Sequence, residues 1–243
     1  MITMYHRFEN KPKSCSPKQF EQQVKLAKQL GAKLTFDDGL KSQYTIAYPI
    51  LKKYKMKGTF FYITNCQEAM CTVHKIWLLL EYFKKELLRV SKVSDKRNPK
   101  LPLSYYQFDD IQTRNLKYYL ATHEDLVDKF FDVYFDEDEE IEKMYMTYPD
   151  IWELYKNGME IGSHSHTHPL LSKLSRRKQE YEIKISTEII EELTEPPLGF
   201  SYPNGFHNKT TINLLKKYGY KYAVTVEKDN IFELGRIDTN DFD

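Results

Sequence analysis

The amino-acid sequence predicts an α/β fold with a parallel sheet and a helical insertion. Segments with strand character alternate with segments of helical periodicity on either side of a central stretch, and this alternation is typical of parallel strands connected by helices. From about residue 65 to 147 the alternation stops, and apolar residues recur at helical spacing. Unusual polar segments follow three of the expected strands, which indicates a site at the ends of those strands.

The elements before the insertion are predicted from local patterns. Residues 2–5 have the character of a short strand, and a helix begins after Ser16, where a capping hydroxyl, Pro17 at the first helical position and Gln19 form a start signal. This helix is expected to end at Gly31. The other elements expected here are strands at 33–36 and 58–64 and a helix at 42–55 that Pro49 interrupts.

Residues 65–147 are predicted to form the helical insertion. One helix is indicated by apolar residues at helical spacing, namely Ile76, Leu79, Leu80, Phe83, Leu87 and Leu88. A second helix is expected to begin at Thr122, because Asp125 follows three residues later. The acidic run at 136–140 is interpreted as a solvated surface. We expect solvated or capping roles for His74 and His123.

The alternation of strands and helices resumes after the insertion. Thr147 and Asp150, with Pro149 in the first turn, predict a helix that ends at Gly158. A long helix is expected over 175–193, with its apolar side marked by Tyr181, Ile185, Ile189 and Leu193. The remaining elements are strands at 159–163, 198–202 and 222–226 and a helix at 208–218.

Composition narrows the classes of function and location. The 243 residues suit one domain, and the net charge of +1, from 36 basic and 35 acidic residues, gives no field that would favour nucleic acid or an anionic membrane. Three cysteines without a CxxC pair fit a reducing compartment. No apolar run approaches the roughly twenty residues of a spanning helix, and Met1 is followed directly by a strand pattern. We therefore expect a cytoplasmic protein without a membrane span.

Three of the seven histidines lie within five residues, at His164, His166 and His168. Neutral imidazole is the commonest protein ligand for a divalent metal and a frequent acid or base near neutral pH. A solvated, histidine-rich loop is the alternative interpretation. Spacing alone does not select two of the three as ligands, because an extended segment would turn all three the same way and Pro169 disfavours a helical turn.

Two other polar segments, Asp37-Asp38-Gly39 and Tyr202-Pro203-Asn204-Gly205, also follow expected strands. The C-terminal ends of parallel strands meet at one edge of a sheet, so we expect these segments to lie near the histidines. A carboxylate and two imidazoles can hold zinc or a similar divalent ion, and the adjacent second carboxylate would be free to act as a base. Each of the two segments by itself is also an ordinary turn.

Three motifs occur in order along the chain: Thr35-Phe36-Asp37-Asp38-Gly39, Ser163-His164-Ser165-His166-Thr167-His168-Pro169 and Phe200-Ser201-Tyr202-Pro203-Asn204-Gly205. They resemble the first three motifs of the NodB-type polysaccharide deacetylases, carbohydrate esterase family four. The opening Tyr5-His6-Arg7 and the strand Gly58-Thr59-Phe60-Phe61 are also similar to that family. The resemblance spans nearly the whole chain apart from the insertion. It implies a distorted (β/α) barrel and metal-dependent removal of N-acetyl groups from sugars.

The resemblance also implies roles for individual residues. The metal ligands that it implies are Asp38, His164 and His168. Asp37 is the implied catalytic base, and a backbone N–H at Asn204 is expected to stabilise the oxyanion together with the metal. Zinc is the metal that we expect, with cobalt, nickel, manganese and iron as alternatives. His166 is left outside the ligand set, either beside the site or at the surface.

The chain departs from the family pattern at two places. Most members have an arginine in the third motif that orients the catalytic aspartate, whereas this chain has Ser201. Arg236 is the candidate to supply the missing guanidinium, and a surface or structural role is the alternative for it. The late segment that supplies the catalytic acid is also missing. His6, at the end of the first strand, is the expected acid, and His207 is the other candidate.

These observations together predict one NodB-like domain over residues 1–243, with an insertion that caps or borders the substrate groove. The expected substrate is an N-acetylated amino sugar in a polymer, an oligomer or a lipid- or nucleotide-linked glycan. A glycan intermediate is favoured over mature cell wall because a cytoplasmic location is expected. The alternatives are a catalytically inactive carbohydrate-binding or complex-forming module and a non-haem iron oxygenase with two histidines and one carboxylate. The sequence predicts neither the sugar and its linkage nor the oligomeric state.

Overall fold

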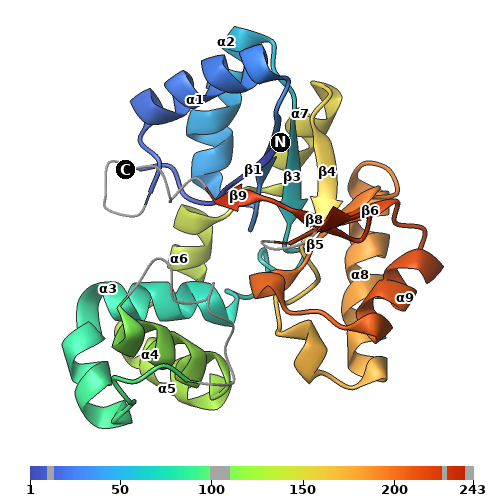
Figure 1. The fold of residues 1–243 in the computed structure, drawn as a ribbon. Helices are drawn as coiled ribbons and strands as arrows, with labels where there is room; N and C mark the ends of the chain where they lie inside the picture. Colours follow the sequence, from blue (N-terminus) through green and yellow to red (C-terminus); the bar gives the residue numbers. More distant parts are fainter. Residues whose placement is uncertain (10–13, 99–109, 226–228, 239–243) are drawn as a thin grey trace. The chain divides into compact units, whose positions relative to one another are not determined.

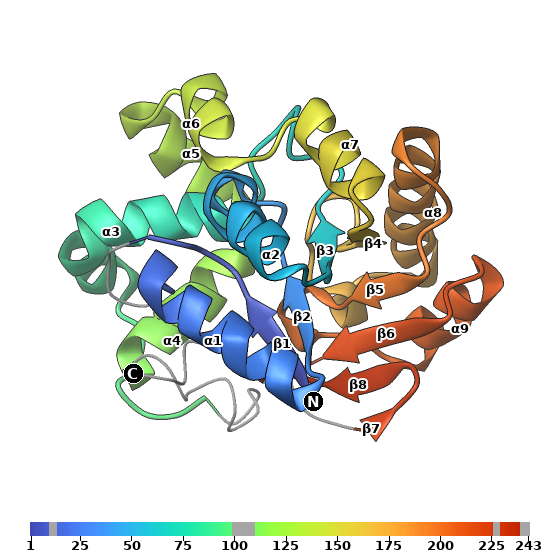
Figure 2. The ribbon, with the colours of Figure 1, turned by 90° about the horizontal axis from the view of Figure 1, so that it is seen from above.

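A curved, mainly parallel sheet provides the strand ends at which the polar motifs lie. The computed structural model describes residues 1–9, 14–98, 110–225 and 229–238 (Figure 1). Within these residues the strand order is β7-β8-β6-β5-β4-β3-β2-β1-β9, and each adjacent pair is parallel except β7 and β8. The strands form a nearly closed barrel with helices on its outer side (Figure 2), so the predicted distorted (β/α) barrel is confirmed.

The bounds of the elements are as follows. The strands are β1 (Ile2–Tyr5), β2 (Lys33–Phe36), β3 (Gly58–Tyr62), β4 (Glu160–Ser163), β5 (Gly199–Ser201), β6 (Tyr222–Thr225), β7 (Asp229–Asn230), β8 (Glu233–Gly235) and β9 (Ile237–Asp238). The helices of the barrel are α1 (Pro17–Leu30), α2 (Tyr48–Tyr54), α7 (Tyr148–Lys156), α8 (Arg176–Leu193) and α9 (Lys209–Lys217). A π-helix, η1 (Gln43–Ala47), precedes α2, and short 3-10 turns are η3 (Leu171–Lys173) and η4 (Pro203–Gly205).

The contacts within the chain group the residues into two compact units. The first comprises residues 1–67 and 142–243 and contains the sheet, whereas the second comprises residues 68–141. The helices of this interval are α3 (Thr72–Ser91), α4 (Ile111–Ala121), α5 (Glu124–Tyr134) and α6 (Glu137–Met144), the last of which continues past the boundary. Their apolar core contains Ile76, Leu79, Leu87, Leu116, Leu120 and Val127. This unit is helical, as the sequence predicts for the interval from 65 to 147.

Most of the helix starts and ends that the sequence predicts are present in the structure, and four expectations need correction. Thr122 does not begin a helix; its hydroxyl donates to the backbone oxygens of Tyr118 and Tyr119 at the end of α4, and α5 begins after His123. Ser16 and Gln19 form the predicted capping box of α1. Residues 43–47 form a π-helix instead of α-helix, and Pro49 lies in the first turn of α2. His74 is fully buried, with its Nδ1 3.1 Å from Cys71 Sγ, because α3 buries that face. The predicted apolar side of α8 is also wrong, since Tyr181 is 55% exposed.

The buried face of α8 is partly polar because it packs against the polar motifs of the barrel. Its buried residues are Gln179, Glu182, Ile183, Ser186, Thr187 and Ile190. Ser186, for example, accepts a hydrogen bond from Ser163 at the end of β4, with the two hydroxyl oxygens 2.9 Å apart. Polar side chains therefore occupy helix positions that an apolar core would normally fill.

The strand register brings the motifs to one edge of the sheet. Tyr5 of β1 pairs with Phe36 of β2, so His6 and Asp37 follow side by side. Tyr62 of β3 pairs with Ser163 of β4, which precedes the first histidine of the cluster. Beneath this edge, aromatic side chains pack between the sheet and its helices; Phe36 and Phe60 stack with ring centroids 4.4 Å apart, and Phe36 also packs edge-on against Phe20 of α1 at 5.9 Å. The close-packed aromatic layer makes the strand ends a rigid platform for polar groups.

None of the helices that the structure describes is long and apolar enough to cross a membrane.

Candidate active site

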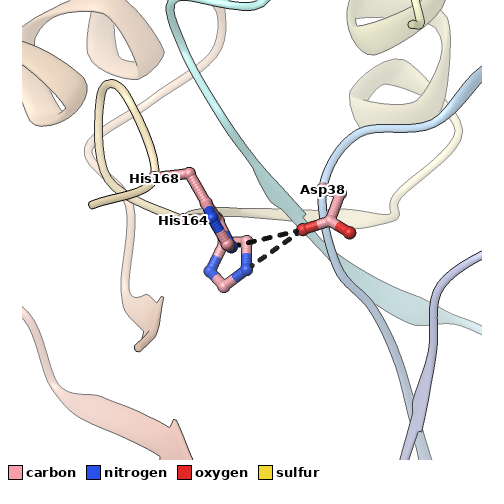
Figure 3. Close-up of side chains that lie close together, drawn as sticks. All are labelled: Asp38, His164 and His168. Atoms are coloured by element: carbon pink, nitrogen blue, oxygen red, sulfur yellow. Dashed lines mark ion pairs between the residues drawn. The ribbon is translucent and has the colours of Figure 1, made fainter. Parts of the chain in front are cut away.

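The side chains of Asp38, His164 and His168 converge at the carboxyl ends of β2 and β4 (Figure 3). The Nε2 atoms of His164 and His168 lie 3.2 and 3.7 Å from Asp38 Oδ1. One donor atom from each of the three side chains lies within 4.8 Å of the others. Asp38 and His164 are each only 2% exposed. The trio expected from the sequence is therefore brought together, with two of its three residues buried.

The hydrogen bonds of His164 leave Nε2 as the atom available to a metal. Its Nδ1 lies 2.8 Å from the backbone oxygen of Ser201, and a carbonyl can only accept, so Nδ1 carries the proton. Metal-binding histidines are commonly oriented in this way by a backbone carbonyl. Burial by itself lowers the pKa of His164, but the charge of Asp37 and the hydrogen bond to Asp38 outweigh it, so the pKa is raised overall.

The three residues fit a divalent ion in both chemistry and spacing. One carboxylate oxygen and two imidazole nitrogens form a donor set that suits zinc and similar metals. Around a tetrahedral zinc with bonds of about 2.0–2.2 Å, two ligand atoms are roughly 3.3–3.5 Å apart. The observed separations of 3.2 and 3.7 Å from Asp38 Oδ1 bracket this value. Three protein ligands would leave room for water and substrate.

The backbone around these ligands adopts conformations that are unfavourable for residues other than glycine. Asp38 has φ 79°, Ser165 has φ 65° and His168 has φ 62°. Each such residue costs about 1–2 kcal/mol, and such conformations concentrate at functional sites. Gly39, at φ 70°, follows Asp38, and a Cβ there would lie 2.5 Å from the ring of Tyr62. The first motif therefore requires glycine at this position.

Asp37 is held by a buried arginine. The guanidinium of Arg236, between β8 and β9, donates from Nη1 to Asp37 Oδ1 and from Nη2 to Oδ2, both at 2.7 Å. Asp37 is 2% exposed and Arg236 is 6% exposed. Ser201 donates to Asp37 Oδ2 at 3.0 Å, and Arg236 Nη1 also reaches Thr35 Oγ1 at 3.2 Å. The structure thus places a guanidinium on Asp37 from the junction of β8 and β9, while the third motif contributes the hydroxyl of Ser201.

The charges around Asp37 keep its carboxylate ionised. Burial raises the pKa of Asp37, but the positive charge of Arg236, the contributions of His164 and His6 and the hydrogen bond from Arg236 outweigh burial and lower it overall. Charge-assisted bidentate pairs of this kind are among the strongest hydrogen-bonded contacts in proteins. Asp37 therefore remains an acceptor at neutral pH.

His6 lies beside Asp37 because β1 and β2 end in register. The side-chain amide of Gln43 donates to the backbone oxygens of both His6, at 2.9 Å, and Asp37. Gln43 is fully buried in the π-helix η1, and π-helical turns are frequent at functional sites. Gln43 therefore joins the ends of the two strands that carry His6 and Asp37. The sequence analysis missed it, because no pattern signals a π-helix.

His207 is engaged by the protein through both ring nitrogens. Its Nδ1 lies 2.9 Å from the backbone oxygen of Gly205 and its Nε2 lies 2.9 Å from Glu233 Oε1. Its ring stacks on Tyr202 at a centroid distance of 4.1 Å. These contacts bind the third motif to β8 and leave neither nitrogen directed at a ligand. The geometry therefore favours His6 over His207 as an acid.

The structure also places the two remaining candidates. Asn204 occupies the turn η4 after β5 at φ 51°, exposed at the same edge of the sheet. His166 turns to Thr64, with its Nδ1 2.9 Å from Thr64 Oγ1, and its ring packs edge-on against Tyr181. Within the described residues, the group that could hold a metal contains the other two histidines of the cluster and not His166.

Comparison with known proteins identifies sequence relatives. A family model described as polysaccharide deacetylase matches residues 16–92 and 96–223. YxkH of Bacillus subtilis (strain 168), whose name assigns it provisionally to the polysaccharide deacetylases, is 24% identical over 195 residues. The match covers 80% of this chain and 44% of that protein, so the chain spans less than half the length of this relative.

Solved structures share the fold. The Streptococcus pyogenes deacetylase PplD in complex with acetate has a TM-score of 0.61 and 21% identity, and the match covers 98% of this chain and 90% of that chain. IcaB from Ammonifex degensii has a TM-score of 0.60 and 16% identity, with 98% and 91% covered. A de-N-acetylase from Aggregatibacter actinomycetemcomitans has the same score and identity, with 97% and 93% covered. At these identities the likeness establishes the barrel fold.

The pairing of Asp37 with Arg236 can be tested through stability. Arg236→Met should lower the free energy of unfolding at pH 7 by about 3–5 kcal/mol, because it leaves a buried carboxylate without its counter-charge. Adding Asp37→Asn to Arg236→Met should recover part of this loss, because no uncompensated charge then remains. Denaturant unfolding of both variants is the measurement. Arg89→Met, at an exposed position of α3, serves as control and should change stability by less than about 0.5 kcal/mol. A loss below about 1 kcal/mol for Arg236→Met would contradict the pairing.

Proposed function

Because the chain belongs to the polysaccharide deacetylase family, we propose that it is a metal-dependent hydrolase that removes N-acetyl groups from an amino sugar. The substrate we propose is a polymeric, oligomeric or lipid- or nucleotide-linked glycan. The observation that carries the proposal is the convergence of Asp38, His164 and His168 beside an ionised Asp37. A deacetylase needs both parts: a place for a Lewis acid and an adjacent base.

The proposed reaction replaces the amide C–N bond with a C–O bond from water and releases acetate and a free amine. A divalent ion held by Asp38, His164 and His168 would polarise the acetyl carbonyl and lower the pKa of water towards neutrality. Asp37 takes a proton from the attacking water. A carboxylate has about four acceptor positions, and the contacts with Arg236 and Ser201 use one on Oδ1 and two on Oδ2. Oδ1 therefore retains a position for that proton.

Two further groups complete the proposed chemistry. The backbone N–H of Asn204 donates to the oxyanion that develops when water attacks the carbonyl. His6 gives a proton to the departing nitrogen, because an amine leaves poorly as an anion. The position of His6 next to Asp37, across the paired ends of β1 and β2, supports this role. The contacts of His207 within the third motif argue against the same role for that residue.

The alternative of an inactive carbohydrate-binding or complex-forming module rests on two missing groups, the arginine of the third motif and the late segment that supplies the acid. The contact between Arg236 and Asp37 supports a replacement for the first, and His6 is the replacement that we propose for the second. The oxygenase alternative has no use for Asp37 and is associated with a different fold, so no observation in this structure favours it. Release of acetate distinguishes the hydrolase from both.

Metal dependence and the role of Asp37 can be tested with one assay. We expect the purified chain to release acetate from one or more members of a panel of N-acetylhexosamine oligomers and lipid- or nucleotide-linked N-acetylhexosamines. Chelation should abolish release, and zinc or cobalt should restore it. Asp37→Asn should reduce kcat by about 10²- to 10⁴-fold, the contribution of a general base. Asp132→Asn, an exposed carboxylate on α5, is the matched control and should leave kcat unchanged. Acetate release that survives chelation, or equal rates for Asp37→Asn and the parent, would refute this mechanism.

The assignment of the acid can be tested with two leaving groups. His6→Ala should lower kcat on the N-acetyl substrate by about 10²- to 10⁴-fold. The same variant should keep most of its activity on an activated aryl acetate, since an aryloxide leaves without needing a proton. His123→Ala, at an exposed position of the helical unit, is the control. Full activity of His6→Ala on the N-acetyl substrate would show that another group is the acid.

A further inference from the structure

We infer that Glu182 of α8 is a positioning residue that holds the histidine loop in the conformation needed to bind the metal. This inference rests on the proposed function, since it concerns the same metal site. Glu182 Oε2 accepts the backbone N–H groups of His166, at 3.0 Å, and Thr167, at 2.8 Å. Its Oε1 accepts the hydroxyl of Thr167 at 2.8 Å. The two residues that it binds lie between the ligands His164 and His168.

The carboxylate of Glu182 is buried, so it depends on its hydrogen bonds to the loop to offset the loss of water. Glu182 is 6% exposed, and in the described part of the chain it forms no ion pair with a basic side chain. A buried carboxylate is strongly unfavourable unless other groups satisfy it. Here the satisfying groups are two successive N–H groups and a hydroxyl of the loop, an arrangement that resembles the backbone nests that bind anions. The loop is therefore wrapped around an anion that belongs to the protein itself.

The loop needs such support because its backbone is strained. Ser165 and His168 both have positive φ, at 65° and 62°. Side chains of the loop supply part of the support: Ser163 Oγ accepts from the N–H of Ser165 at 3.1 Å, and Ser165 Oγ accepts from the N–H of His168 at 3.0 Å. Between Ser165 and His168, the backbone N–H groups are bound by Glu182, which lies on the separate helix α8.

The two histidine ligands should depend on Glu182 to different degrees. His164 follows β4 directly and is fixed at Nδ1 by the backbone of Ser201. His168 comes after the segment that Glu182 binds, so the orientation of the 166–167 peptide determines where its ring points. Removal of Glu182 should release His168 first. Groups that orient metal ligands typically change metal affinity by about 10- to 100-fold.

Cobalt binding provides the test, because the visible absorption of Co²⁺ reports its coordination geometry independently of catalysis. The test uses the parent chain and three variants, Glu182→Ala, Glu182→Gln and Glu188→Ala. Each protein is freed of metal, checked for folding by circular dichroism and titrated with Co²⁺. Glu188 lies on the same helix but is exposed and forms a surface ion pair with Lys184 at 3.6 Å, which makes it the matched control. We expect Kd to rise about 10- to 100-fold for Glu182→Ala, with an altered absorption spectrum. Kd for Glu188→Ala should stay within about twofold of the parent.

Glu182→Gln provides a second readout if the alanine variant does not fold. Glutamine has the same shape and keeps one oxygen for the loop N–H groups but loses the charge, so its Kd should lie between those of the parent and Glu182→Ala. A folded Glu182→Gln or Glu182→Ala with the Kd and spectrum of the parent would overturn the inference and leave the proposed function intact. A parent chain that binds no Co²⁺ would overturn the metal site and the role of Glu182 together.

Discussion

The buried pair of Asp37 and Arg236 is the interaction on which the site most depends. A carboxylate that is 2% exposed remains an anion only if a positive charge or several hydrogen-bond donors offset its burial, and for Asp37 the main compensation is a fixed positive charge. Arg236 provides that charge in a planar, bidentate geometry that lysine could not reproduce. The pair also joins the first motif, near the start of the chain, to the last strands of the sheet. The base of the proposed reaction and the closure of the barrel are therefore stabilised by one contact.

Strain is a second feature that the polar motifs share. Asp38, Ser165, His168 and Asn204 are residues other than glycine with positive φ, and they come from all three motifs. Such backbone persists where surrounding contacts over-determine it. Those contacts are visible here: Gln43 ties the ends of β1 and β2, Glu182 binds the histidine loop, and His207 binds the third motif to β8. The site is thus held by polar side chains at each strand end.

Much of the fold and of the candidate site follows from the sequence for physical reasons. The capping boxes at Ser16 and Thr147 are local and operate as predicted. The polar segments meet because parallel strands in register end at one edge, which brings Asp38 to His164 and His168. The family resemblance then gives these residues roles, and the absence of arginine at position 201 makes Arg236 the candidate for the missing guanidinium.

Other features depend on contacts between distant segments and could not be predicted. Strands β7, β8 and β9 are two or three residues long and carry no periodic signal. The spacing of apolar residues alone predicts the wrong buried side for α8, because Glu182 and Ser186 face the barrel and bind its polar loops. The polar residues Gln179, Glu182 and Ser186 also recur at helical spacing, and this pattern matches the side of α8 that is buried.

The central claim is that Asp38, His164 and His168 form one metal centre beside Asp37. Anomalous diffraction from crystals of the zinc-loaded protein tests it most directly. The account predicts a single strong zinc peak within about 2.0–2.2 Å of one Asp38 oxygen and of Nε2 of both histidines, with Arg236 still paired to Asp37. Zinc bound elsewhere, or no peak among these three residues at saturating zinc, would contradict it.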